Sequence, residues 1–258
     1  MTAGSVVLKG GHVLDPAQGL NDKLDLRIEG EHVAAIGQDL PIDDALVVPI
    51  PSGLVLCPGF IDMHVHFREP GQEHKETIAS GAAAAAAGGF VAAACMPNTD
   101  PVYDHVGITE EILNRASDAG LAKVYPIGAA ALGSRGEQMT EIGALKAAGC
   151  VGVSDDGHPI ASALMMRRAL EYVSMFDMPV INHCEEPSLK GDGVAHEGYQ
   201  ANALGLRGIP GECESIMVER DVSLSELTGG AIHVAHMSAR QSLRAVQVGK
   251  ERNDRVTC

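Results

Sequence analysis

The chain has 258 residues, of which 45% are hydrophobic and 21% charged, a composition typical of a globular protein. Its formal net charge of −15 argues against nucleic acid and anionic membrane surfaces as partners. The longest run of small apolar residues, 82–87, is too short to span a bilayer, and the N-terminus lacks the pattern of a signal peptide. The six cysteines are scattered without a Cys-x-x-Cys pair, which favours reduced thiols. We therefore expect a cytoplasmic protein.

The first 57 residues predict a small β-sandwich module. Short runs of aliphatic and β-branched residues are separated by turn residues such as Gly10, Gly11 and Pro16. The expected strands are residues 5–8, 12–14, 24–28 and 32–36, and residues 53–57 lead into the strand that follows. We expect a first domain of residues 1–57, because the sequence pattern changes at residue 58.

From residue 58 to residue 258, short apolar runs alternate with helical patterns. The expected strands begin at residue 58 and continue with residues 90–96, 122–131, 151–154, 179–183 and 231–236. The expected helices are residues 75–87, 108–119, 140–148, 163–175, 212–227 and 239–248. Residues 255–258 look like the start of a seventh strand. Helical crossovers force the strands to pair in parallel.

Polar residues gather where these expected strands end. They include His64, His66 and Arg68 on the first strand, Asn98 after the second, Asp155 and Asp156 after the fourth, His183 on the fifth and His236 on the sixth. Such residues at successive strand ends are typical of a (β/α)8 TIM barrel, whereas a doubly wound sheet binds its ligand at one switch point. A whole barrel takes about 250 residues. We therefore expect an α/β fold with an incomplete barrel of about six βα units in residues 58–258, truncated before strands seven and eight.

The most informative motif lies in residues 58–71. Side chains alternate along a strand, so Asp62, His64, His66 and Arg68 share one face. Two imidazoles on one side of a strand suit a zinc ion, and a guanidinium beside them suits a planar carboxylate. We expect Asp62 to orient one of the histidines, and the alternative is that it only caps the strand. The alternative is a pair of core histidines and a surface arginine, but the end of an apolar strand favours a metal site.

The motif Pro-Gly-Phe-Ile-Asp-x-His-x-His-x-Arg-x-Pro-Gly, together with segments 96–99 and 155–157, resembles the dihydroorotases of the longer, class I bacterial type. These belong to the cyclic amidohydrolase superfamily, and the resemblance covers essentially the whole chain. It implies a metal-dependent hydrolase barrel with one or two Zn²⁺ ions. The implied reaction is the reversible, zinc-dependent cyclisation of N-carbamoyl-L-aspartate to (S)-dihydroorotate in de novo pyrimidine (UMP) biosynthesis.

The resemblance also implies the metal ligands. They are His64, His66, Asp156, His183 and His236. Asp156 stands where many members of the superfamily have a carbamylated lysine. Asp155 remains an alternative to Asp156, and both could instead form a turn or a helix cap. His233 and His236 have opposite strand parity, so at most one faces the centre, and we choose His236 because it is nearer to the strand end.

Substrate binding is implied for His66, Arg68 and Asn98. Relatives that act on allantoin usually carry asparagine at the position of Arg68, and hydantoin or dihydropyrimidine relatives also lack this arginine. The general acid/base of the family is an aspartate at the end of strand eight. We expect that residue to lie beyond Cys258, so no catalytic residue is assigned within the chain, and we expect the chain itself not to turn over substrate.

Two other functions are compatible with the sequence. One is a related cyclic amidohydrolase of the allantoinase or hydantoinase type. The other is an inactive dihydroorotase-like partner of aspartate carbamoyltransferase, although inactive copies tend to lose metal ligands and five remain here. The resemblance also favours a homo-oligomer and an association with aspartate carbamoyltransferase. The sequence leaves the number of metal ions open.

Overall fold

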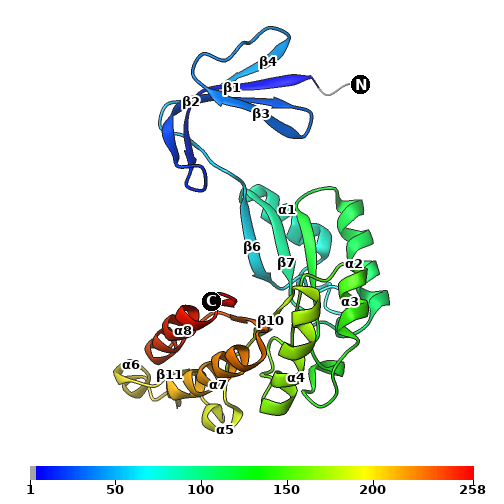
Figure 1. Ribbon diagram of the computed structural model, residues 1–258, viewed down its shortest axis with the longest axis vertical. Coiled ribbons are helices and arrows are strands. Elements are labelled where there is room, and N and C mark those ends of the chain that lie inside the picture. Colours follow the sequence, from blue (N-terminus) through cyan, green and yellow to red (C-terminus); the bar gives the residue numbers. More distant parts are fainter. Residues whose placement is uncertain (1–3) are drawn as a thin grey trace. The chain divides into compact units, whose positions relative to one another are not determined.

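The computed structural model describes residues 4–258 of the chain (Figure 1). The chain divides into two compact units, the first ending at Phe60 and the second running from Ile61 to Cys258. No helix within the described residues combines the length and the apolar character that a membrane span requires.

A five-stranded sheet forms the described part of the first unit. Its strands are β1 (Ser5–Asp15), β2 (Leu20–Glu29), β3 (His32–Gly37), β4 (Ala45–Pro49) and β5 (Val55–Leu56). β1 is central, because it pairs antiparallel with β2 and parallel with both β4 and β5. β3 extends the sheet by pairing antiparallel with β2.

The predicted strands at residues 5–8 and 12–14 are in fact one strand, β1. Its pairing with β2 shifts in register between Leu8 and Gly11, and Gly10 has a φ of 74°, in the left-handed region. Asp25 accepts the N–H of Gly10 at 2.8 Å. The two glycines therefore make a β-bulge, which bends a strand without ending it, instead of the predicted turn. The sequence analysis also did not predict β4.

The second unit repeats a strand and a helix along the chain, as predicted. Its main strands are β6 (Phe60–Val65), β7 (Phe90–Cys95), β8 (Lys123–Gly128), β9 (Gly152–Ser154), β10 (Pro179–Asn182), β13 (Ala231–Val234) and β14 (Val256–Thr257). The helices between them are α1 (Ile78–Ala87), α2 (Val106–Ala119), α3 (Ile142–Ala148), α4 (Ala163–Val173), α7 (Glu212–Thr228) and α8 (Arg240–Arg252). Two short 3₁₀ helices, Leu132–Ser134 and Ser174–Phe176, lie in the connections.

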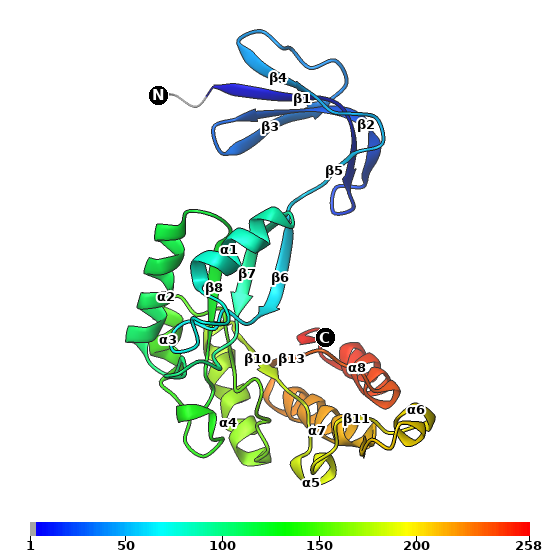
Figure 2. The ribbon, with the colours of Figure 1, turned by 180° about the vertical axis from the view of Figure 1, so that it is seen from behind.

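The strands of the second unit follow one another in the sheet in chain order. Within the described residues the order is β14-β13-β10-β9-β8-β7-β6, and the pairs from β7 to β14 are parallel. A doubly wound sheet would reverse its strand order at a switch point, and this sheet does not. The sheet curls, and the helices lie along its outer side (Figures 1 and 2). This is the strand arrangement of a barrel wall.

Local sequence signals explain where several helices begin and end. Thr77 caps α1 by accepting the N–H of Ser80, whose side chain in turn accepts the N–H of Thr77. Gly120 and Gly149 end α2 and α3 with φ of 62° and 117°, which glycine adopts readily. The largest hydrophobic core packs α4 and α7 against the outer face of the sheet. The strand ends that carry polar residues are thereby held in fixed positions.

The segment between β10 and α7, expected to be a long loop, contains short elements. They are α5 (Pro187–Lys190), β11 (Ala195–His196), α6 (Tyr199–Ala203) and β12 (Gly208–Ile209). β11 and β12 pair in parallel. Elements of two to five residues are too short to show a hydrophobic period, so the sequence did not reveal them.

Candidate metal centre

Two histidines at the end of β6 lie beside a buried aspartate. Asp156 follows β9 and is 4% exposed. His64 Nε2 is 3.6 Å from Asp156 Oδ1, and His66 Nε2 is 3.6 Å from Asp156 Oδ2. The alternation along the first strand predicted that both histidines face the same side, and in the structure both imidazoles face this carboxylate.

Two further histidines reach the same carboxylate from the next strands. His183, directly after β10, has Nδ1 3.7 Å from Asp156 Oδ1. His236, two residues past β13, has Nε2 3.6 Å from the same oxygen and 3.0 Å from His183 Nδ1. His236 has a φ of 35°, an unusual backbone conformation for this residue of the kind that gathers at functional sites. The five residues predicted as ligands therefore converge on one point.

The geometry of this cluster fits a metal ion. Two groups, His64–His66–Asp156 and Asp156–His183–His236, each bring three ligand atoms within 4.8 Å of one another, and they share Asp156. Asp156 Oδ1 is buried and has no hydrogen-bond partner among the described residues. Ligand atoms bound to one tetrahedral zinc ion are about 3.4 Å apart. The separations of 3.6–3.7 Å are thus longer than good hydrogen bonds but suit ligands that surround a cation.

The charges in the cluster are also those of a metal site. Burial alone would raise the pKa of the Asp156 carboxyl, but the imidazoles of His183, His236 and His64 hold that pKa well below its usual range. The nearby carboxylate of Asp156 raises the pKa of His183. Burial lowers the pKa of His66. Asp156 is therefore an ionised carboxylate, and because a metal ion binds only neutral imidazoles, metal affinity should rise with pH.

Asp155, the alternative ligand, points away from the histidines. Its Oδ1 atom accepts the backbone N–H groups of Ala130 and Ala131, both at 2.9 Å. Burial raises the pKa of Asp155 to about 6, although these two hydrogen bonds oppose the shift. Of the two neighbouring aspartates, only Asp156 is surrounded by imidazoles. Asp155 instead holds the loop after β8 to the end of β9.

Two other residues lie differently from the ligands. His233 on β13 is outside the cluster, and its Nδ1 is 2.9 Å from Thr257 Oγ1. Asp62 accepts the backbone N–H of His64 at 3.1 Å. This contact is with the main chain of His64, which agrees with the alternative of a strand cap, and the orientation of a histidine by Asp62 stays a prediction.

Asn98 contacts the cluster through both ends of its carboxamide. Its Oδ1 is 3.0 Å from His66 Nδ1, and its Nδ2 is 3.5 Å from Asp156 Oδ2. In a neutral imidazole, a proton on Nδ1 that is donated to Asn98 leaves the lone pair of Nε2 free, and Nε2 is the atom of His66 that faces Asp156. Asn98 therefore selects the tautomer of His66 that can bind a metal ion.

We expect Asn98→Ala to lower the affinity of the chain for zinc about 10- to 100-fold, because His66 loses the partner that orients it. Competition with a chromophoric chelator measures this affinity. Asn114→Ala, at an exposed position of α2, is the control and should leave the affinity unchanged. Equal zinc affinity in wild type and Asn98→Ala would contradict this role.

The side chain of Arg68 lies next to the cluster and is free to bind a ligand. Its guanidinium makes no hydrogen bond or ion pair with any residue in the described part of the chain, and its positive charge contributes to lowering the pKa of His66, after burial. A partly exposed arginine beside the imidazole of His66, without a partner among the described residues, is suited to an anionic group of a ligand.

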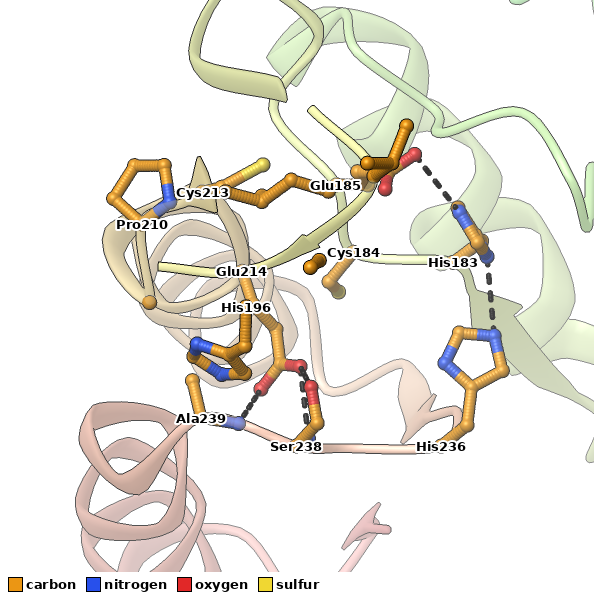
Figure 3. Close-up of a pocket in the computed structure, with 14 residues that line it drawn as sticks. His183, Cys184, Glu185, His196, Pro210, Cys213, Glu214, His236, Ser238 and Ala239 are labelled. Carbon is orange, nitrogen blue, oxygen red and sulfur yellow. Dashed lines mark hydrogen bonds and ion pairs between the residues drawn. The ribbon is translucent and has the colours of Figure 1, made fainter. Parts of the chain in front are cut away.

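A cavity of about 310 Å³ opens beside the cluster. Figure 3 shows His183 between His236 and Glu185 on its lining, with Glu214 directed at Ser238 and Ala239. The sequence analysis did not select Glu185, whose Oε2 is 3.4 Å from His183 Nε2. The sequence feature that could have pointed to Glu185 was its position two residues after His183. Glu185 therefore contacts the ring nitrogen of His183 that does not face Asp156.

Glu214 fixes the loop after β13. Its carboxylate accepts the N–H and Oγ–H of Ser238, each at 2.8 Å, and the N–H of Ala239 at 3.0 Å. Ala239 immediately precedes α8, so the negative charge also lies at a helix N-terminus. Burial alone would raise the pKa of Glu214, but the surrounding donors outweigh it and lower that pKa.

We expect Glu214→Gln to lower the free energy of unfolding of the metal-free chain by about 1–2 kcal/mol at pH 7. The pKa of Glu214 is lowered on folding, so its contribution is present above its unfolded pKa and is lost as pH falls through the folded value. The difference between wild type and variant should therefore shrink as the pH falls through and below the ordinary pKa of a glutamate. Urea denaturation at several pH values measures it, with the exposed Glu212→Gln as control. A difference that is independent of pH would refute this explanation.

Comparisons with known proteins agree with this site. The family described as dihydro-orotase-like matches residues 53–242. A dihydroorotase of Syntrophotalea carbinolica is 50% identical over 252 residues, which are 98% of this chain and 59% of that protein. A dihydroorotase of Anaeromyxobacter sp. (strain K) is 50% identical over 251 residues, 97% of this chain and 58% of that protein. This chain thus spans less than two thirds of the length of these relatives.

Solved structures resemble the fold at low sequence identity. The L-hydantoinase (dihydropyrimidinase) from Arthrobacter aurescens has a TM-score of 0.77 and 17% identity, covering 99% of this chain and 57% of that chain. The dihydropyrimidinase from Brevibacillus agri NCHU1002 has a TM-score of 0.70 and 20% identity, covering 98% and 56%. The predicted fold class, an incomplete (β/α)8 barrel of the metal-dependent hydrolase type, is confirmed. The predicted family is confirmed as well: the chain belongs to the dihydro-orotase-like family.

Proposed function

We propose that this chain provides the metal centre and part of the substrate site of a zinc-dependent dihydroorotase. The reaction is the reversible cyclisation of N-carbamoyl-L-aspartate to (S)-dihydroorotate, in de novo synthesis of pyrimidine nucleotides in the cytoplasm. The observation that carries the proposal is the convergence of four imidazoles on Asp156, together with Arg68, which lies near His66 and has no side-chain partner in the described part of the chain. Identity of 50% to proteins named dihydroorotase supports it.

In this proposal His64, His66, His183, His236 and Asp156 hold one or two zinc ions. Imidazole nitrogens and a carboxylate are a donor set that zinc accepts, and a carboxylate shared by two ligand groups can bridge two ions. Zinc bound there supplies a Lewis acid for the ring carbonyl and lowers the pKa of water. The chain contributes the positions of these ligands, through the strand ends, Asn98 and Asp155.

Arg68 binds the free carboxylate of the substrate in the same proposal, together with Asn98 and His66. A guanidinium donates two parallel hydrogen bonds to a carboxylate, which fixes the orientation of the ring as well as its affinity. The chain has a net charge of −15 and does not attract anions as a whole. Local cations must therefore hold an anionic substrate, and Arg68 and the metal are placed to do so.

The proposal extends to assembly. We propose a homo-oligomer that associates with aspartate carbamoyltransferase, as the family resemblance implies. Size-exclusion chromatography with light scattering, on the chain alone and mixed with that transferase, tests both parts. Elution of the chain as a monomer would contradict the homo-oligomer. Elution of the chain separately from the transferase would contradict the association.

The test of the activity uses the chain itself and a longer chimera. In the chimera, residues 1–258 continue into the remaining C-terminal part of the Syntrophotalea carbinolica relative. We expect the zinc-loaded chimera to open the ring of (S)-dihydroorotate and to leave allantoin and dihydrouracil largely unreacted. The chain of 258 residues should bind zinc without turning over substrate. Preference of the chimera for allantoin or dihydrouracil would favour the allantoinase or hydantoinase type instead.

A further inference from the structure

A buried carboxylate outside the metal centre contacts two of the segments that carry its ligands. Asp221 lies in the middle of α7, and its side chain is fully buried. Burial of a charged group is unfavourable unless the group is paired and hydrogen-bonded. The proposed reaction has no step for Asp221, so its contacts indicate its role.

The first set of contacts is to the end of β10. Asp221 Oδ2 accepts a hydrogen bond from Asn182 Nδ2 at 2.6 Å, and Cys184 Sγ lies 3.6 Å from the same oxygen. Asn182 and Cys184 are both buried and are the two chain neighbours of His183. Asp221 therefore fixes the main chain on either side of this histidine.

The second set of contacts is to the segment after β9. Asp221 Oδ1 accepts a hydrogen bond from Arg220 Nε at 2.8 Å and lies 2.6 Å from its Nη2. The same guanidinium donates to the backbone oxygens of Ile160 and Ala161, at 2.8 and 2.7 Å. Asn182 Oδ1 also accepts the N–H of Ile160 at 3.2 Å. Helix α7 therefore binds the end of β10 and the segment after β9, and these two segments are also hydrogen-bonded to each other.

These contacts join three strand ends at the metal centre. Ile160 follows Asp156 by four residues, and Asn182 directly precedes His183. The backbone oxygen of Asn182 also accepts the N–H of Ala235 at 3.2 Å, in the loop that carries the histidine after β13. A metal site binds its ion more tightly when neighbouring residues hold the ligands in place.

We propose that Asp221 is a positioning residue for the metal centre. Through Asn182 and Arg220 it sets the separation of His183 and Asp156, so that both reach the same ion. The inference rests on the proposed metal centre, and it is independent of which substrate the enzyme accepts.

The test measures metal binding by the 258-residue chain. Asp221→Asn keeps the volume of the side chain but turns one acceptor oxygen into a donor amide that faces other donors. We expect the affinity for zinc, measured by competition with a chromophoric chelator, to fall about 10- to 100-fold. The visible absorption bands of the cobalt(II)-loaded chain should also shift, because they depend on the geometry of the ligands.

The control must also remove a buried hydrogen bond from α7. Ser225→Ala does so, because the fully buried Ser225 donates from Oγ to Gly230 O at 2.6 Å and contacts neither segment of the network. It should leave the zinc affinity within about twofold of wild type and the cobalt(II) spectrum unchanged.

If Asp221→Asn does not fold, a milder variant tests the positioning role instead. Arg220, whose side chain is 19% exposed, can be replaced by lysine, which keeps the charge but lacks the fork that reaches two backbone oxygens. We expect Arg220→Lys to weaken zinc binding about threefold or more. If a folded Asp221→Asn or Arg220→Lys variant has wild-type zinc affinity and an unshifted cobalt(II) spectrum, the role of Asp221 is overturned and the proposed metal centre still stands. A wild-type chain that binds no zinc would overturn the metal centre and the inference with it.

Discussion

Replacement of Asp156 by asparagine should abolish tight zinc binding, with a loss of affinity of about 100-fold or more. Asp156 is the single residue shared by both ligand groups, and it supplies the only negative charge among the five ligands. Asparagine keeps the size and one oxygen but has no charge to offset that of the cation. Inductively coupled plasma mass spectrometry after dialysis gives the zinc content, and chelator competition gives the affinity.

Asp155→Asn is the matched control, since it makes the same chemical change at the neighbouring residue. The Oδ1 atom of asparagine can still accept the two backbone N–H groups that Asp155 accepts. The pKa of Asp155 is raised to about 6, so a neutral side chain is tolerated there. We expect zinc affinity close to that of wild type. Loss of zinc from Asp155→Asn with retention in Asp156→Asn would reverse the assignment of the ligand.

The repeated βα pattern of the second unit could be predicted because it depends on local signals. Short apolar runs predicted β7, which follows two glycines, and β10, which begins at a proline, and Gly120 and Gly149 predicted the ends of α2 and α3. The prediction of a turn at Gly10 and Gly11 was wrong, because the local signal there is ambiguous. Two successive glycines can make a turn or a bulge, and only the pairing of β1 with β2 across both decides between them.

The candidate ligands lie at or just after the ends of strands, which meet at one edge of a barrel, and the family resemblance implied which of these residues bind the metal. Contacts between distant residues could not be predicted in this way. Asn98 and His66 are 32 residues apart, and Asn182 and Asp221 are 39 residues apart. Neither pair has a spacing that a helix or a strand imposes. The residues that orient the ligands were therefore visible only in the structure.

Arg68→Ala should weaken the binding of (S)-dihydroorotate to the zinc-loaded chain about 100-fold and leave its zinc content unchanged. The arginine fork can donate two charge-assisted hydrogen bonds to a carboxylate, and alanine donates none. The Arg68 side chain has no partner among the described residues, so its removal leaves no other group unpaired. Isothermal titration calorimetry on wild type and variant measures the affinity.

Two controls show whether the effect comes from the carboxylate. Dihydrouracil has the same ring without that group, so its affinity should be nearly equal in wild type and Arg68→Ala. Arg168→Ala removes an exposed arginine of α4 and should leave both affinities unchanged. If Arg68→Ala loses zinc, or weakens both ligands equally, Arg68 acts on the metal centre or the fold. The choice between a carboxylate-bearing ring and an uncharged one would then have to come from another residue.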